Sequence, residues 1–219
     1  MSTPVAELGR RAKEASRVLA TASTPAKDAA LAAAADLLVQ RTSEILQANA
    51  TDVARAEGSG HAATVVDRLR LTPARVEAMA DGLRQVAALP DPVGEVVGGW
   101  TRPNGLLIEK VRVPLGVVAI IYEHRPNVTS DAFGLCLKSG NAAFLRGSGA
   151  ALASNLAVAG ALREGLDKAG LPADALVLVD DVRHEAVVEF MRLREYIDCL
   201  IPRGGPSLIK AIMENATVP

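Results

Sequence analysis

The chain has 219 residues, of which 49% are hydrophobic and 22% charged, so one domain or one and a half with a substantial core is expected. Its 24 Lys and Arg residues against 25 Asp and Glu residues leave a formal net charge of -1, which excludes the basic surface of a non-specific nucleic-acid binder. No apolar stretch reaches the roughly 18 residues of a membrane span and the first residues lack a signal segment, so we expect a soluble cytoplasmic protein with neither nucleic acid nor membrane as partner.

Residues 1–92 have the composition of a helical region, rich in Ala, Leu, Glu, Lys and Arg. Thr24-Pro25 and Thr72-Pro73 each place a capping hydroxyl before a proline, which predicts a helix start at both positions. Gly58-Ser59-Gly60 interrupts the region, and Leu89-Pro90-Asp91-Pro92 ends it.

Residues 93–114 change to short β-rich pieces around Arg102-Pro103-Asn104-Gly105. Asn-Gly favours the positive φ angles of a tight hairpin turn, so an exposed β-hairpin is predicted. It could be an oligomerisation arm or a plain surface hairpin, and the residues favour neither.

Residues 115–219 repeat a strand, a loop and a helix at the spacing of βαβ units. The apolar runs are continuous rather than alternating, which is typical of strands buried on both faces of a parallel sheet. We therefore predict an α/β fold, a doubly wound and mostly parallel sheet preceded by the helical region. The predicted strands are Val117–Tyr122, Asn141–Leu145, Leu176–Val179 and Ile197–Ile201, and the predicted helices run near 129–139, up to Gly170, up to Arg192 and up to Asn215.

Thr217-Val218-Pro219 resembles the start of a further strand that is cut off. A complete domain rarely ends inside an element, so a fragment is expected.

Four loops follow the predicted strands, at the edge where open parallel sheets bind ligands. They are Glu123–Asn127, Arg146–Gly149, Asp180-Asp181 and Arg203–Pro206. Two of them combine an arginine with glycines before a helix, which favours a phosphorylated or dinucleotide ligand held by converging guanidinium and backbone N–H groups. Neither loop matches a standard phosphate motif, so each by itself could be an ordinary turn.

The first loop contains Asn127, whose amide could donate to an oxyanion or could cap the following helix. His124 in the same loop is expected to be solvated. Cys136 falls inside a predicted helix and Cys199 inside a predicted buried strand, so both are expected to be core residues and neither a nucleophile. His61, His124 and His184 lack metal-ligand spacing, and no metal site is expected.

Several long motifs lie between about Val111 and Pro219. They are Val113-Pro114-Leu115-Gly116-Val117, Tyr122-Glu123-His124-Arg125-Pro126-Asn127-Val128-Thr129, Cys136-Leu137-Lys138-Ser139-Gly140-Asn141, Leu145-Arg146-Gly147, Tyr196-Ile197-Asp198, Ile201-Pro202-Arg203-Gly204-Gly205 and Glu214-Asn215-Ala216-Thr217-Val218-Pro219. Together these motifs resemble the gamma-glutamyl phosphate reductase family of the aldehyde dehydrogenase superfamily, which has a Rossmann-like sheet. The helical region before them is compatible with the family but less diagnostic.

The resemblance implies NADPH-dependent reduction of L-glutamyl 5-phosphate to L-glutamate 5-semialdehyde with release of phosphate, a step of proline biosynthesis. In this family a cysteine thiolate forms a thioester that accepts hydride. Asn127 matches the asparagine that stabilises the oxyanion, and Arg146, with Gly147 and Ser148, matches the loop that contacts the adenosine ribose. The remaining matches, near the cofactor pyrophosphate, are Arg203, Gly204 and Gly205.

The sequence departs from the family in two ways. Ser148-Gly149-Ala150 lacks the acidic residue common in this loop of the superfamily, which leaves NADP or NAD preference open. The chain also ends before the family's thiolate and substrate domain, so by itself it is expected to be inactive. A homo-oligomer is expected of the full-length enzyme, and self-association of this chain is a further hypothesis. A non-catalytic dinucleotide-binding module and a purely structural protein remain the alternatives.

Overall fold

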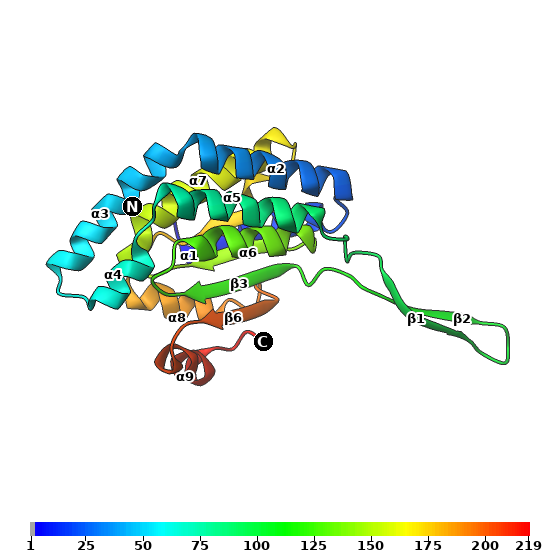
Figure 1. Ribbon diagram of the computed structural model, residues 1–219. Helices are drawn as coiled ribbons and strands as arrows, with labels where there is room; N and C mark the ends of the chain where they lie inside the picture. Colours follow the sequence, from blue (N-terminus) through cyan, green and yellow to red (C-terminus); the bar gives the residue numbers. More distant parts are fainter. Residues whose placement is uncertain (1–2) are drawn as a thin grey trace.

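The computed structural model describes residues 3–219 and consists of a parallel sheet between helical layers, with one hairpin extending away (Figure 1). The helices are α1 (Val5–Leu19), α2 (Thr24–Gln40), α3 (Thr42–Gly58), α4 (Ala63–Leu69), α5 (Pro73–Ala88), α6 (Asn127–Lys138), α7 (Leu152–Lys168), α8 (His184–Arg192) and α9 (Pro206–Asn215). The strands are β1 (Val96–Thr101), β2 (Leu107–Val111), β3 (Val117–Tyr122), β4 (Ala142–Arg146), β5 (Leu176–Leu178) and β6 (Cys199–Arg203).

The larger sheet has the strand order β5-β4-β3-β6, with every neighbouring pair parallel. All six residues of β3 are buried, as the continuous apolar run predicts, because neighbouring strands flank it and helices cover it. The prediction of a buried strand at 197–201 is wrong in extent: β6 begins two residues later and lies at the edge of the described sheet. Ile201 is 44% exposed there.

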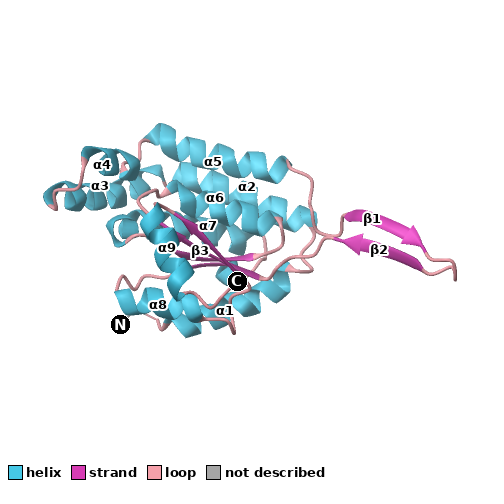
Figure 2. Ribbon diagram, turned by 90° about the horizontal axis from the view of Figure 1, so that it is seen from below, coloured by secondary structure: helices cyan, strands magenta, loops and turns pink. Residues whose placement is uncertain are grey.

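Helices cover both faces of the sheet, which confirms the doubly wound architecture. The helices α6 and α7 lie on one face, with α2 and α5 packed over them, while α1 and α8 lie on the other (Figure 2). The N-terminal helical region is therefore part of the same core as the α/β region.

The predicted helix starts are confirmed, but one of the two capping residues differs. Thr72 caps α5 by accepting a hydrogen bond from the backbone N–H of Arg75 at 3.2 Å. At α2 the cap is Ser23, and Thr24 instead donates its hydroxyl proton to Asp91 Oδ2 at 2.6 Å. Thr24 has a tertiary partner, which local sequence rules do not include.

Two buried lysines join α2, α6 and the segment that leads to the hairpin. Lys27 Nζ, whose side chain is 1% exposed, lies 2.6 Å from Asp91 Oδ2 and donates to the Lys138 carbonyl. Lys138 Nζ lies 2.6 Å from Asp28 Oδ1 and donates to the Ala87 carbonyl. Each ammonium group is therefore paired with a carboxylate, as burial of charge requires.

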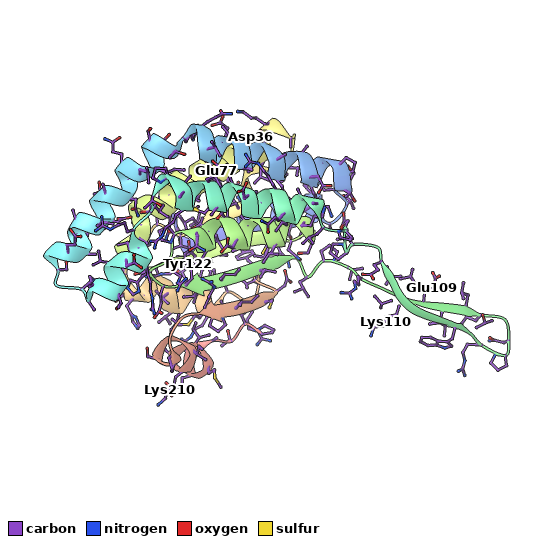
Figure 3. The ribbon with its side chains drawn as sticks, in the orientation of Figure 1. Asp36, Glu77, Glu109, Lys110, Tyr122 and Lys210 are labelled. Atoms are coloured by element: carbon purple, nitrogen blue, oxygen red, sulfur yellow. The ribbon has the colours of Figure 1, made fainter. Side chains whose placement is uncertain are left out.

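The β1–β2 hairpin stands away from the body of the molecule, and Glu109 and Lys110 project from it into solvent (Figure 3). Its turn is not the predicted Asn-Gly turn with two positive φ angles. Gly105 alone has a positive φ, 84°, and its N–H donates to the Arg102 carbonyl. A longer connection closed by the Arg102 N–H and the Leu106 carbonyl at 2.8 Å allows Asn104 to keep a negative φ.

Residues 217–219 do not form a strand, although they lie against the sheet. The Leu200 N–H of β6 donates to the Pro219 carbonyl at 2.8 Å, and Val218 is buried. The segment thus runs beside β6, and the predicted strand start is not formed within it.

Candidate functional site

The four candidate loops meet at one edge because the strands that precede them are parallel. The register pairs Ile121 of β3 with Arg146 of β4, and Tyr122 of β3 with Arg203 of β6. Both predicted arginines therefore end their strands at the same edge, one on each side of β3.

The two guanidinium groups nevertheless project from opposite faces of the sheet. Successive strand residues point to opposite faces, so the partners of Ile121 and Tyr122 do as well. Arg146 turns toward the segment before α8, where it donates to the Val182 carbonyl at 3.2 Å. Arg203 lies on the α6 face, and in this arrangement the two arginines do not converge on one anionic group as the sequence predicts.

The Arg146 loop rests on a buried polar chain. Gly147 leaves room for Asn155, because a Cβ at position 147 would overlap Asn155 Nδ2 and lie 3.1 Å from the Tyr122 ring. Thr129 connects these two side chains: its Oγ1 lies 2.7 Å from the Tyr122 hydroxyl and donates to Asn155 Oδ1. Asn155 Nδ2 is buried with no hydrogen-bond partner among residues 3–219. The loop is thus fixed closely over α7.

Ser148 and Arg146 hold the same loop from its solvent side. Ser148 Oγ accepts a hydrogen bond from the Ala150 N–H at 3.2 Å. Arg146 also donates to the Gly147 carbonyl at 3.0 Å. Burial lowers the pKa of the Arg146 guanidinium, and the charge of Asp181 opposes this shift.

Glu123 is a site residue that the sequence analysis missed. Its Oε2 accepts a hydrogen bond from the Gly205 N–H at 3.0 Å, so the carboxylate lies at the N-terminus of α9, where anions are stabilised. A Cβ on Gly204 would come within 2.8 Å of that carboxylate. Its position directly after a buried strand is the only signal that the sequence carries for this contact.

Asn127 is the first residue of α6 and does not cap it. Its Nδ2 donates to Asp131 Oδ2 at 2.8 Å, and its amide carries a second N–H for another acceptor. Burial raises the pKa of Asp131, while the hydrogen bond from Asn127 and the charge of Arg203 oppose the rise. His124 is half-buried, and its ring centroid lies 6.0 Å from that of His61.

The two cysteines differ in their surroundings. Burial raises the pKa of Cys136 to about 12. Cys199 is partly exposed rather than buried as predicted, because β6 lies at the sheet edge. Within residues 3–219 no group of three or more His, Cys, Asp or Glu side chains could hold a metal ion, and none of the described helices is long and apolar enough to cross a membrane.

A cavity of about 460 Å³ opens beside Glu123 and is lined by arginines from three parts of the chain. Arg203 ends β6, Arg125 lies in the loop after β3, and Arg68 comes from α4. An adjoining cavity of about 300 Å³ shares Arg68 and Arg125 and contains Asn127. Arg125 lies in one of the four predicted loops but was not singled out, and Arg68 was missed, since nothing local in the sequence connects α4 with these loops.

The aldehyde dehydrogenase family model matches residues 2–218. The chain belongs to the aldehyde dehydrogenase family. Over 98% of its length it is 54% identical to the gamma-glutamyl phosphate reductase of Mesorhizobium japonicum, of which it covers 50%. These matches confirm the resemblance on which the sequence analysis relied.

Solved structures of this family agree with the fold. The gamma-glutamyl phosphate reductase of Thermotoga maritima superposes with a TM-score of 0.96 at 43% identity, over 99% of this chain and 52% of that one. The gamma-glutamyl phosphate reductase of Saccharomyces cerevisiae gives a TM-score of 0.92 at 28% identity, over 100% and 56%. The chain thus spans about half the length of the relatives it matches.

Proposed function

We propose that this chain is the dinucleotide-binding part of a cytoplasmic enzyme that uses NADPH to reduce L-glutamyl 5-phosphate to L-glutamate 5-semialdehyde, releasing phosphate, in proline biosynthesis. The observation that carries the proposal is the identity of about half of all residues with gamma-glutamyl phosphate reductases along nearly the whole chain. The loops at the carboxyl edge of the sheet support it, because this is where open α/β sheets bind nucleotides.

The residues at this edge fit a dinucleotide. A Cβ at Gly205 would meet no atom within 4 Å, so a ligand can approach the backbone there, and Arg146 with Gly147 and Ser148 would hold the ribose end. Gly205, at the start of α9, would face the pyrophosphate, for which the Glu123 carboxylate would have to release the Gly205 N–H. When bound, NADPH supplies the hydride.

Asn127 would stabilise the substrate oxyanion through the amide proton that Asp131 does not accept. The nucleophilic thiolate would come from a segment outside these residues, because burial of Cys136 disfavours its thiolate. We therefore expect this chain, mixed with NADPH and acyl phosphate, to show no oxidation of the cofactor; sustained turnover would contradict this assignment.

A non-catalytic dinucleotide-binding module is the second candidate, favoured because neither the arginine cavity nor the adjoining cavity with Asn127 is lined by a cysteine. An open reading frame that continues past Pro219 into a cysteine-containing segment would favour the enzyme. A stop codon at that point would favour the module.

Replacing Arg146 with Ala should weaken NADPH binding by about 1–3 kcal/mol, because charge-assisted contacts to the adenosine end are lost. Titration of the chain while following NADPH fluorescence measures the affinity. Arg10→Ala is the matched control, since Arg10 is exposed and its ion pairs are with Glu7 and Glu14 of its own helix. Equal NADPH affinity in wild type and Arg146→Ala would remove Arg146 from the site.

We also propose that the hairpin is an oligomerisation arm, because it carries exposed apolar side chains that include the single tryptophan, Trp100, at 53% exposure. Trp100→Glu should raise the dissociation constant of self-association about thirtyfold, because an interface tryptophan typically contributes about 2 kcal/mol. Light scattering over a concentration series measures this, with Glu109→Gln on the same arm as control. A monomeric wild type at every concentration would reject the arm.

A further inference from the structure

The arginine cavity contains more positive charge than the surrounding protein neutralises. Arg68, Arg125 and Arg203 line it together with His124, Gly204 and Gly205, and Glu123 is its one carboxylate. That carboxylate is already hydrogen-bonded to the N-terminus of α9. Among the described residues none of the three guanidinium groups has an ion pair within 4.0 Å.

Neighbouring arginines on the same side of the molecule show the contrast. Arg70 pairs with Glu57 at 2.8 Å, and Arg75 lies 3.3 Å from Asp67 while donating to two backbone carbonyls. These side chains connect α3, α4 and α5 and have structural partners. The cluster formed by Arg68, Arg125 and Arg203 instead faces a space large enough for a small ligand.

We infer that Arg68, Arg125 and Arg203 bind the phosphoryl group of the acyl phosphate substrate. The inference rests on the proposed function and assigns the substrate side of the same site. It gives Arg203, which the family resemblance places near the cofactor pyrophosphate, to the substrate instead. Three guanidinium groups against one carboxylate suit a doubly charged phosphoryl group, which guanidinium binds in a forked geometry.

Gly205, proposed above to face the cofactor pyrophosphate, lines the same cavity, and the position of Asn127 assigns the arginines there to the substrate phosphoryl group. In an acyl phosphate a single oxygen joins the carbonyl carbon to phosphorus, so the phosphoryl site must adjoin the donor to the carbonyl oxygen. The cavity that contains Asn127 shares Arg68 and Arg125 with the arginine cavity. Arg146, the residue assigned to the cofactor, projects from the opposite face of the sheet.

The test is calorimetric titration of this chain with inorganic phosphate. We expect the variants Arg68→Gln, Arg125→Gln and Arg203→Gln each to weaken phosphate binding about tenfold. Arg68→Lys should weaken it less than Arg68→Gln, because lysine keeps the positive charge but lacks the bidentate geometry of a guanidinium group. Arg10→Gln should bind like the wild type. Circular dichroism confirms folding, which these exposed side chains are expected not to affect.

NADPH titration of the same variants separates this inference from the proposed function. Unchanged NADPH affinity in Arg68→Gln, together with weakened phosphate binding, supports the assignment. Three results would overturn it: no phosphate binding by the wild type, phosphate affinity in all three variants equal to that of the wild type, or a loss of NADPH affinity with phosphate affinity unchanged. Phosphate binding without any NADPH binding would support the arginine site and contradict the proposed function.

Discussion

Replacing the buried Lys27 with Met should lower the free energy of unfolding by about 3–5 kcal/mol, the loss typical of removing one member of a buried ion pair. The ammonium group lies 2.6 Å from Asp91 Oδ2 and donates to the Lys138 carbonyl at 3.2 Å. Without it, the Asp91 carboxylate keeps only the Thr24 hydroxyl and the Val93 N–H as hydrogen-bond donors among the described residues. Methionine preserves the volume, so the loss reports charge pairing rather than a cavity.

Urea denaturation followed by circular dichroism measures this loss. The double variant Lys27→Met with Asp91→Asn should recover part of it, because no unpaired carboxylate remains. Lys210→Met is the control: Lys210 is exposed and lies 3.9 Å from Glu214, so a change below about 0.5 kcal/mol is expected. A loss no larger than that of the control would contradict a role for the pair in stability.

The same pair makes stability depend on pH. Burial by itself would raise the pKa of Asp91, but hydrogen bonds from Lys27, Thr24 and Val93 outweigh burial and hold that pKa below its ordinary value of 3.8. A carboxyl with a lowered folded pKa contributes its stability above the unfolded value and loses it as pH falls through the folded value. The wild type should therefore lose this stability below about pH 4, and Lys27→Met should lose less of it on acidification.

Replacing Asp52 with Ala should lower the free energy of unfolding by about 3 kcal/mol or more. The Asp52 side chain is fully buried and accepts hydrogen bonds from the Ala153 N–H at 3.3 Å and from the N–H and hydroxyl of Ser154, each at 2.7 Å. Truncation leaves these donors of the first turn of α7 without their acceptor, at about 1–3 kcal/mol for a buried group.

Thermal and urea denaturation of Asp52→Ala measure the loss, and Asp52→Asn should show a smaller one because its amide oxygen still accepts. Glu44→Ala is the control on the same helix, since Glu44 is exposed. Because α7 begins directly after the Arg146 loop, NADPH affinity should fall together with stability. If Asp52→Ala loses no more free energy of unfolding than Glu44→Ala, the prediction is wrong, and water replaces the carboxylate as the acceptor.

Elements with strong local signals could be predicted from the sequence. The continuous apolar run gives β3 at the predicted residues, and Thr72-Pro73 gives the start of α5. Boundaries were less accurate where the signal is tertiary: β6 ends at Arg203 rather than at 201, since the register with β3 sets its extent. The cap of α2 is Ser23 rather than Thr24, because Thr24 donates its hydroxyl proton to Asp91, which lies 67 residues away.

The candidate site was predicted in part. The loops after the parallel strands had to meet at one edge, so Asn127, Arg146 and Arg203 could be placed near one another before the fold was known. Glu123 was missed, because its contact with the Gly205 N–H spans 82 residues of sequence. Arg68 was missed because it belongs to a helix in the N-terminal region.

The sequence by itself determined the parallel α/β layer, the helical region before it and the family, because buried strands, helix starts and long motifs are local properties of the chain. Only the tertiary structure decided that Arg146 and Arg203 point to opposite faces, since a one-residue difference in register reverses the direction of a strand side chain. It also decided that Arg68 joins Arg125 and Arg203 around one cavity. Arginines from distant segments form a binding site only when packing brings the segments together and their guanidinium groups face the same cavity.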